Sequence, residues 1–343
     1  MVVIAGAGIA HPTVQTQDEL WSGFFSHHYS GVQRALAARL FRNSGVERRH
    51  GVINPAIEDV TGWSTAKRMQ RYLTEALPLG KSAVADALDG AGLAASEIGL
   101  FAVCSCTGYV TPGLDILLAR DLGMSPDTQR LFIGHMGCYA ALPGLGVVTD
   151  FVRSRGRPAV LLCLELTSLH AQPPSADADQ IVAHSLFSDA AAAVVVLPDG
   201  PGYEVMAVDS LTDAATADHM TWDVTDLGFR MGLSPRVPDV LDLHVEPLVD
   251  GLLARQGLHR DDVDGWAVHP GGPRILDVVG KRLGLGEEAM APSRRVLAEH
   301  GNCSSPTVLM IVDSLRAAAP RNVLAMAFGP GLTLYATLLR AVP

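Results

Sequence analysis

Nearly continuous apolar runs of eight or nine residues recur along this 343-residue chain and limit the folds it can adopt. A strand with one solvent-exposed face alternates apolar and polar residues, whereas an uninterrupted apolar run indicates a strand that is buried on both faces. Segments with helical periodicity lie between the runs, as at 80–93, where a glycine marks the end. The pattern predicts an α/β fold whose sheets are covered by helices. The clearest runs are IGLFAVCSC (98–106), PAVLLCLEL (158–166), AAAAVVVLP (190–198) and NVLAMAFG (322–329).

A short turn-forming stretch, residues 198–202, divides the chain into two halves of comparable length. Beyond it the order of elements repeats, beginning with a strand YEVMAVDS and continuing with a helix near 240–256. We therefore expect two similar halves, residues 1–200 and 201–343. Further expected elements are strands at 2–8, 130–136 and 265–270 and helices at 33–43 and 304–318, with 130–136 expected to be a buried strand.

The overall charge and the cysteine content exclude several classes of protein. A net charge of −10 attracts neither nucleic acid nor an anionic membrane, and no apolar run approaches the roughly 20 residues of a membrane span. The N-terminus shows no basic leader or cleavage motif. Five cysteines, an odd number in mostly apolar surroundings, favour the reducing cytoplasm over a disulfide framework. Cys104 and Cys106 lie in a continuous apolar run, so no zinc pair is expected there.

Arginines cluster near the start of the chain and leave two interpretations open. Such a cluster is either a solvated helix face or a binding site for the phosphates of a large substrate or cofactor. Its members are Arg34, Arg39, Arg42, Arg48 and Arg49.

Three distant segments carry the residue types of a thiol-based active site: Cys138 in HMGCYAALPGLG, His269 in WAVHPGGPRILD and Asn302 in EHGNCSSP. A thiol, an imidazole and a carboxamide can together form a nucleophile and hold an oxyanion. Cys138 is expected between a strand and a helix, where the helix N-terminus and a nearby imidazolium would favour a thiolate at neutral pH. Each residue alone also has a structural explanation: a buried apolar cysteine, a histidine bonded to backbone, and a helix-capping asparagine.

Taken together, the motifs resemble those of type III polyketide synthases, the chalcone synthase-like family, in a bacterial form. The resemblance extends from ARLFRNSGVERRH to AFGPGLTLY and includes Gly-Cys at 137–138, HPGGPRILD (269–277) and GNCSS (301–305). LFSD (186–189) and FGPGLT (328–333) add the gatekeeper and cavity-loop segments.

This resemblance implies a thiolase-like fold in five αβαβα layers, built as a homodimer. It also implies repeated decarboxylative condensation of malonyl-CoA onto an acyl-CoA starter held on Cys138, with His269 and Asn302 donating hydrogen bonds to the malonyl thioester carbonyl. Cyclisation would then give a pyrone or a resorcinol- or phenol-type product. Coenzyme A thioesters are substrates in this scheme, and neither a further cofactor nor a metal is needed.

The resemblance also transfers substrate-pocket positions onto this chain. Phe187 is the expected first gatekeeper, and Met231 replaces the second, a phenylalanine in plant members. Thr111 would reach into the cavity of the neighbouring subunit. Of the family's basic CoA-binding positions only Arg39 is kept, because Leu36 and Asn43 stand where lysines are usual. The other expected pocket residues are Cys106, Thr107, Thr167, His170, Ser304, Gly329, Pro330 and Gly331.

Three alternatives use the same residue types. A ketoacyl-acyl carrier protein synthase III-like condensing enzyme shares the fold but would require a carrier protein. A papain-like cysteine peptidase has the same chain order of Cys, His and Asn. The third is a thiolase-like binding protein without activity.

Overall fold

A computed structural model describes all 343 residues, Met1–Pro343. The strands are β1 (Val3–Ala10), β2 (Val14–Thr16), β3 (Arg48–His50), β4 (Leu100–Cys104), β5 (Gln129–Ile133), β6 (Ala159–Leu166), β7 (Asp189–Leu197), β8 (Gly202–Thr212), β9 (Met220–Thr225), β10 (Gly228–Leu233), β11 (Gly265–Val268), β12 (Asn322–Gly329) and β13 (Thr333–Val342). The α-helices are α1 (Gln17–Gly23), α2 (Gly31–Arg42), α3 (Thr65–Ala91), α4 (Leu114–Leu122), α5 (Ala141–Arg155), α6 (Ala178–Leu186), α7 (Val237–Arg255), α8 (Pro273–Leu283), α9 (Glu287–His300) and α10 (Pro306–Leu315).

Nine strands form one mixed sheet in the order β11-β12-β13-β8-β1-β7-β6-β4-β5. In the first half of the chain β4 and β6 are parallel, and β7 and β1 continue the sheet antiparallel to their neighbours. In the second half β11, β12, β13 and β8 repeat this arrangement in the same order. The two blocks are joined by a short antiparallel pairing of β1 with β8. Only β5, which lies parallel beside β4 at the sheet edge, has no counterpart.

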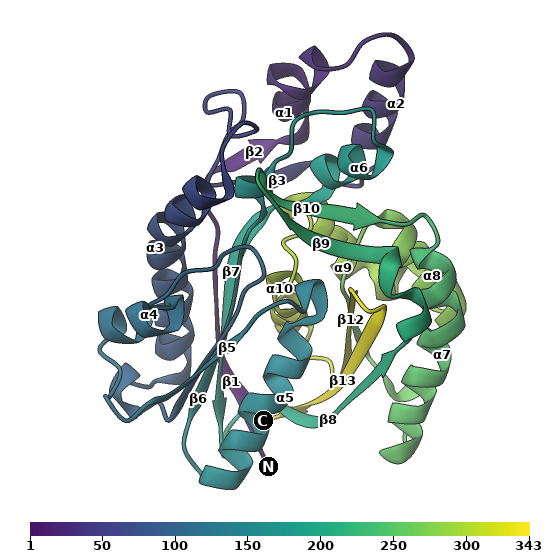
Figure 1. Cartoon of the computed structure of the whole chain (residues 1–343). Coiled ribbons are helices and arrows are strands. Elements are labelled where there is room, and N and C mark those ends of the chain that lie inside the picture. The colour runs from purple at the N-terminus through teal and green to yellow at the C-terminus, as the bar shows by residue number, and fades with distance from the viewer.

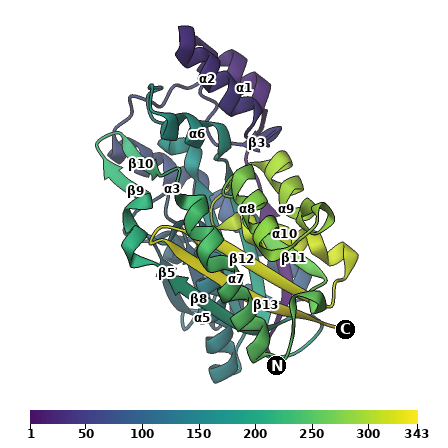
Figure 2. The same ribbon diagram turned by 90° about the vertical axis from the view of Figure 1, so that its right-hand side faces the viewer.

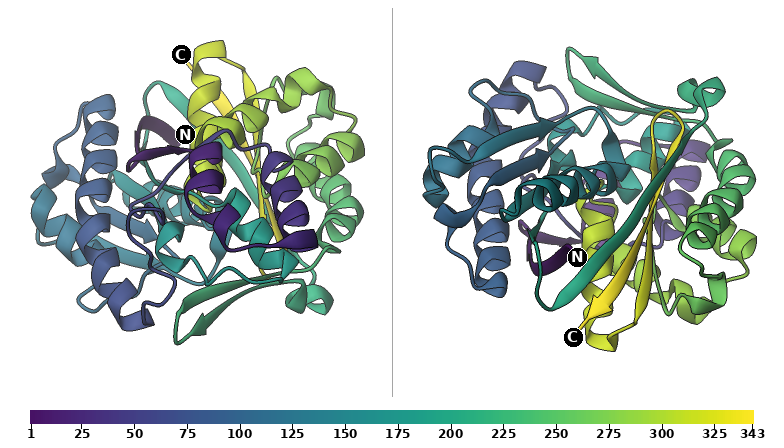
Figure 3. Two further views of the ribbon diagram at one scale, coloured as in Figure 1. Left: turned by 90° about the horizontal axis from the view of Figure 1, so that it is seen from above. Right: turned by 90° about the horizontal axis from the view of Figure 1, so that it is seen from below.

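The elements stack in five layers (Figures 1 and 3). Helices α3 and α4 cover the outer face of the first block, α5 and α10 lie between the blocks, and α7 and α8 cover the outer face of the second. Each helix layer has its own apolar core, and the central one combines α5 and α10 with strands of both blocks. The apolar runs of the sequence are thus covered on both faces, as expected.

Smaller elements gather at the end of the molecule opposite to the two termini (Figures 1 and 2). They are α1, α2, α6, the β2–β3 pair and the β9–β10 hairpin. Side chains from α2, α6 and β10 line the largest cavity of the protein, so this end carries the candidate site.

One expectation about the fold is wrong. Segment 130–136 was expected to be a buried strand, but β5 is largely exposed, including Leu131 (37 %) and Phe132 (38 %). β5 is the edge strand of the sheet and has a neighbouring strand on one side only. Local sequence does not reveal whether a strand lies at an edge. None of the helices is both long enough and apolar enough to cross a bilayer.

Candidate active site

Cys138 lies in a single 3₁₀ turn, Gly137–Tyr139, that connects β5 to α5. Gly137 has a φ of +73°, a conformation that glycine adopts at little cost, and a side chain there would come within 3.1 Å of the Pro330 ring. Cys138 itself is 7 % exposed. The expected strand-to-helix position of the cysteine is found, with one extra turn before the helix.

His269 directly follows β11, where its backbone N–H donates to the Met326 carbonyl at 2.8 Å. The residue is 1 % exposed, and neither ring nitrogen has a hydrogen-bond partner. Buried polar atoms are normally paired, so an unpaired imidazole at a strand end indicates a group kept free for a bound molecule.

Asn302 precedes α10 and is held by backbone hydrogen bonds to the other half of the chain. Its N–H donates to Leu186 O, and its carbonyl accepts from Ser188 N–H, both at 2.9 Å. The side-chain Oδ1 accepts from the Ser304 N–H at 2.9 Å, which assigns the amide orientation and leaves Nδ2 as the available donor. The cap position of α10 is Ser305, so Asn302 is not the capping residue of this helix.

These three residues line one cavity of about 410 Å³. Phe187 and Met231, the expected gatekeepers, line it too, and they also line both of the smaller cavities described below. Most of the remaining wall is apolar and comes from α2, α6, α7 and the loop before α8. The fold therefore brings the proposed nucleophile, imidazole and amide to one enclosed space, although 131 and 33 residues separate them along the chain.

The protonation states differ from the sequence-based expectation of a thiolate. Burial raises the pKa of Cys138 to about 11, and a hydrogen bond with Ser304 offsets this only in part. Burial likewise lowers the pKa of His269 to about 3. Loss of hydration destabilises both charged forms more than the adjacent helix N-terminus stabilises the anion. At neutral pH the site holds a thiol and a neutral imidazole, so the thiol proton must leave as the sulfur attacks.

Glu165, at the end of β6, was not singled out from the sequence and is fully buried beside the site. Its carboxylate accepts hydrogen bonds from Cys106 N–H (3.0 Å), Thr107 Oγ1 (2.7 Å) and Ser305 Oγ (2.9 Å). Burial raises the pKa of Glu165 to about 7, while these donors oppose the shift. The only indication of a special role in the sequence was the position of this acidic residue within an apolar run, PAVLLCLEL.

A second cavity, of about 20 Å³, lies next to Cys138. Seven of the expected pocket residues line it: Phe187, Met231, Cys106, Thr107, Thr167, Ser304 and Pro330.

The flanking glycines of the FGPGLT segment do not line any of the cavities described here. A side chain at Gly329 would come within 2.7 Å of the Tyr139 ring, and Gly331 has a φ of +135°. These glycines therefore allow the loop to pack against the turn that holds Cys138, and only Pro330 between them reaches the cavity.

A third cavity, of about 80 Å³, is lined by His170 together with Thr167 and two aromatic residues that the sequence analysis did not assign to the pocket, Trp222 and Phe229. The His170 ring stacks on Phe229 with a centroid distance of 4.4 Å, and its Nε2 lies 2.6 Å from Thr107 O. Trp222 Nε1 donates to Cys106 O at 2.8 Å. These three large rings, two of them held by hydrogen bonds, restrict the space in this cavity.

The arginine cluster divides into exposed and buried members. Arg39 is exposed on α2, next to Leu40 of the large cavity. Arg49 is only 6 % exposed and donates to the carbonyls of His184 and Phe187, so it is a structural residue and not a phosphate ligand. Arg274, which was not assigned a role from the sequence, lines the large cavity.

Thr111 is exposed in the loop between β4 and α4 and lines none of the three cavities of its own chain. Its expected role in a neighbouring subunit stays a prediction.

Solved structures share this fold over its whole length. The 1,3,6,8-tetrahydroxynaphthalene synthase of Streptomyces coelicolor A3(2), a bacterial type III polyketide synthase, superposes with a TM-score of 0.93 at 30 % identity and covers 99 % of both chains. PKS-I of the brown alga Ectocarpus siliculosus gives 0.93 at 29 % identity, covering 99 % of this chain and 98 % of the other. The expected thiolase-like fold is therefore confirmed.

Sequence comparison gives the same class. The Chalcone and stilbene synthases N-terminal domain matches residues 2–200 and the C-terminal domain residues 205–343. The 1,3,6,8-tetrahydroxynaphthalene synthase of Streptomyces peucetius subsp. caesius is 35 % identical, covering 90 % of this chain and 85 % of its own. The alpha-pyrone synthesis polyketide synthase-like Pks18 of Mycobacterium tuberculosis is 33 % identical, with 88 % and 81 % covered. The chain belongs to the chalcone and stilbene synthase family and is a type III polyketide synthase, an acyltransferase that condenses malonyl-CoA.

Proposed function

We propose that Cys138 carries the growing acyl chain and that His269 and Asn302 stabilise the charge that develops on malonyl-CoA. The observation that carries this proposal is the single 410 Å³ cavity lined by all three side chains. Their roles follow from chemistry: the sulfur is the strongest nucleophile among the three, and the other two supply N–H donors.

Loading of the starter begins with two neutral groups. His269 accepts the Cys138 proton while the sulfur attacks the starter thioester carbonyl, and the carbon–sulfur bond to coenzyme A breaks. The imidazolium then protonates the departing CoA thiolate. The result is acyl-Cys138, free coenzyme A and a neutral imidazole, so protons and charge balance.

In the extension step, the N–H groups of His269 and Asn302 donate to the thioester carbonyl of malonyl-CoA. Negative charge grows on that oxygen as CO₂ leaves, and prearranged donors in a dry cavity stabilise it strongly. The resulting enolate carbon attacks acyl-Cys138 and releases the thiolate. Transfer of the lengthened chain back to Cys138 begins the next cycle.

The test separates starter loading from decarboxylation. We expect Cys138→Ala to abolish chain extension, while His269→Gln and Asn302→Ala still load a radiolabelled starter in part but lose malonyl-CoA decarboxylation. Cys163→Ala, at a buried core cysteine outside the cavities, is the matched control. Decarboxylation at the wild-type rate in His269→Gln or Asn302→Ala would show that the assigned role is wrong.

We propose an aliphatic or malonyl starter and a pyrone or a resorcinol- or phenol-type product. The large cavity has mostly apolar walls, which suits an alkyl chain, whereas the rings of His170, Trp222 and Phe229 restrict the 80 Å³ cavity. The names of two relatives, an alpha-pyrone synthesis polyketide synthase-like protein and a tetrahydroxynaphthalene synthase, support a cyclised product of this kind. Mass spectrometry of products from a panel of acyl-CoA starters tests this, and preference for a bulky aromatic starter would contradict it.

Coenzyme A is proposed to enter past Arg39 and Arg274. Arg39 lies on α2 beside wall residue Leu40, and Arg274 is exposed and lines the same cavity. Their guanidinium groups can bind the CoA phosphates. We expect Arg39→Ala and Arg274→Ala each to raise the KM for malonyl-CoA with little change in kcat, and Arg153→Ala, on the distant end of α5, to leave both unchanged.

We propose that the enzyme works as a homodimer through the β5 edge. Leu131 and Phe132 are exposed there, and Thr111 is exposed in the loop that follows β4, the strand paired with β5. An exposed apolar edge strand is a ready template for a second copy. Sedimentation analysis should give a dimer that Leu131→Lys weakens, and a wild-type monomer would contradict the proposal. Five free cysteines agree with the proposed cytoplasmic location.

A further inference from the structure

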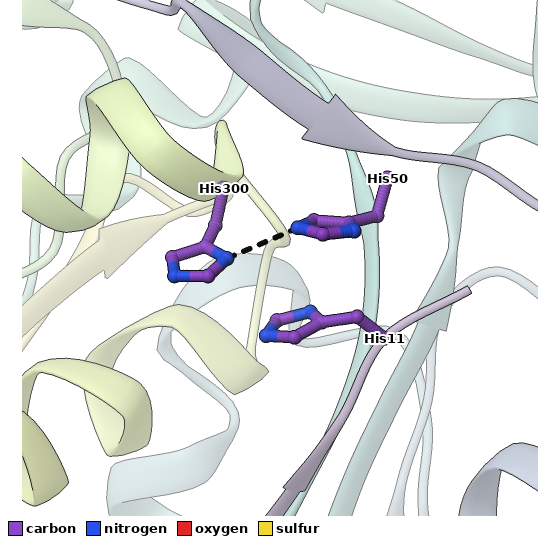
Figure 4. A group of neighbouring side chains, drawn as sticks. All are labelled: His11, His50 and His300. Atoms are coloured by element: carbon purple, nitrogen blue, oxygen red, sulfur yellow. Dashed lines mark hydrogen bonds between the residues drawn. The ribbon is translucent and has the colours of Figure 1, made fainter. Parts of the chain in front are cut away.

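Three histidines from distant parts of the chain meet outside the 410 Å³ cavity, and one of them, His50, also lines the 80 Å³ cavity (Figure 4). His11 follows β1, His50 ends β3 and His300 ends α9, so the group connects the first and second halves of the chain. Each offers a ring nitrogen, and these atoms all lie within 4.8 Å of one another. The side chains are half-buried, which leaves a path for a small ion.

The hydrogen bonds around His50 assign its tautomer. Its Nδ1 lies 3.2 Å from the Pro12 carbonyl, which can only accept, so Nδ1 carries the proton. Nε2 is then the lone-pair atom, and it lies 3.1 Å from His300 Nδ1. A backbone carbonyl that holds the far ring nitrogen is the usual support of a metal-binding histidine.

His300 and His11 have matching features. Glu299 Oε2 lies 4.0 Å from His300 Nε2, so a carboxylate stands near the ring nitrogen that faces away from His50. His11 Nδ1 is buried without any hydrogen-bond partner. The His11 ring stacks on both other rings, with centroid distances of 4.2 and 4.5 Å, so the rings must rotate out of this stack before their three lone pairs can meet at one ion. Cation binding would replace the His50–His300 hydrogen bond.

We propose that His11, His50 and His300 bind one divalent transition-metal ion of the Zn²⁺, Ni²⁺ or Cu²⁺ class. Imidazole nitrogen is a preferred ligand of these ions, whereas Mg²⁺ and Ca²⁺ prefer oxygen. Arg48, beside His50, places a positive charge near His50 and His300 that opposes any bound cation, so the imidazole–metal bonds must outweigh this repulsion. Three protein ligands leave a position for water.

The bound ion would connect the two halves next to the active site. His300 is two residues before Asn302, and the His50 N–H donates at 2.8 Å to Ser188 Oγ, whose own N–H donates to the Asn302 carbonyl. An ion that binds only the folded chain stabilises it by mass action. We therefore expect bound metal to raise the melting temperature without being needed for condensation.

The test uses tag-free full-length protein, stripped with a chelator and titrated with Zn²⁺ by calorimetry and with Co²⁺ by visible absorption. We expect one ion per chain and a Co²⁺ spectrum without the thiolate charge-transfer band that a cysteine ligand would give. His300→Gln and His11→Phe should each weaken binding by at least about 10-fold. His11→Phe keeps a stacking ring, so thermal unfolding can confirm that this variant is folded.

His259→Gln, at an exposed histidine outside the group, should bind as the wild type does. The proposal is overturned if stripped wild-type protein binds neither ion, if a thiolate band appears, or if folded His11→Phe and His300→Gln retain wild-type affinity. Equal loss in His259→Gln would likewise show that the ion binds elsewhere.

Discussion

The ends of β4 and β11 occupy equivalent places in the two halves of the molecule but present opposite chemistry. After β4, the polar groups of Cys106 and Thr107 are bonded to the buried carboxylate of Glu165. After β11, His269 is just as buried, yet neither of its ring nitrogens is bonded. The helices that follow in the central layer, α5 and α10, begin close after Cys138 and Asn302.

This difference distinguishes polar groups that stabilise the fold from polar groups that are free to bind a substrate. A buried network in which each member is bonded stabilises one arrangement, while an unbonded buried group destabilises the protein unless a ligand satisfies it. We infer that the first half holds the cavity in shape and supplies the nucleophile, and the second half supplies the free donors. The following predictions test that division, from the largest expected effect to the smallest.

Replacing the unbonded imidazole should affect chemistry far more than stability. We expect His269→Ala to lower the rate of malonyl-CoA decarboxylation by about 10²–10³-fold, the effect of removing one donor to a developing oxyanion. The unfolding midpoint in urea should change little, because removal of an unbonded buried imidazole offsets the packing that is lost. A large loss of stability with near-normal decarboxylation would reverse the proposed division.

The Cys138 thiol should react slowly at neutral pH. Because burial raises its pKa to about 11, the thiolate fraction at pH 7 is lower by about 10²-fold than for an ordinary cysteine. The rate of carbamidomethylation of Cys138, followed by mass spectrometry against a small thiol, should therefore keep rising up to pH 10. A plateau below pH 8 would instead support the thiolate expected from the sequence.

The buried imidazole should make the protein sensitive to acid. The pKa of His269 is lowered to about 3 in the fold, so its contribution to stability is full above the unfolded value near 6.5 and is lost as pH falls toward 3. At pH 5 this loss is about 2 kcal/mol. The free energy of unfolding of His269→Gln, measured at pH 7 and pH 5, should fall by that much less than in the wild type.

Glu165 should have the opposite pH dependence and the smallest effect. Its pKa is raised to about 7, so its contribution is present below its ordinary value near 4.5 and is lost as pH rises through 7. Glu165→Gln places an amide against the donors of Cys106, Thr107 and Ser305, and we expect a loss of about 1 kcal/mol at pH 5. The loss in urea unfolding should shrink at pH 8, and an increase there would contradict the assigned ionisation.

Much of this arrangement was predictable from local pattern and motif. Apolar runs located the central strands, and the glycine at 92 marks the end of α3, where it adopts a φ of 66°. The motifs placed Cys138 before a helix and Phe187 at the cavity. The burial of β5 was predicted wrongly, because whether a strand has a neighbour depends on the whole sheet. Arg49 was wrongly grouped with exposed arginines for the same kind of reason, since its carbonyl partners lie more than 130 residues away.

The amino-acid sequence by itself determined the family, the alternation of strands and helices and the identity of the reactive groups, because these depend on residue type and short spacing. Only the tertiary structure decided the protonation states of Cys138, His269 and Glu165, because burial sets them. It also decided the grouping of His11, His50 and His300, whose 39- and 250-residue separations leave no pattern in the sequence. Local periodicity encodes helices and strands. The burial of titratable side chains and the meeting of the three histidines arise only when distant segments pack together.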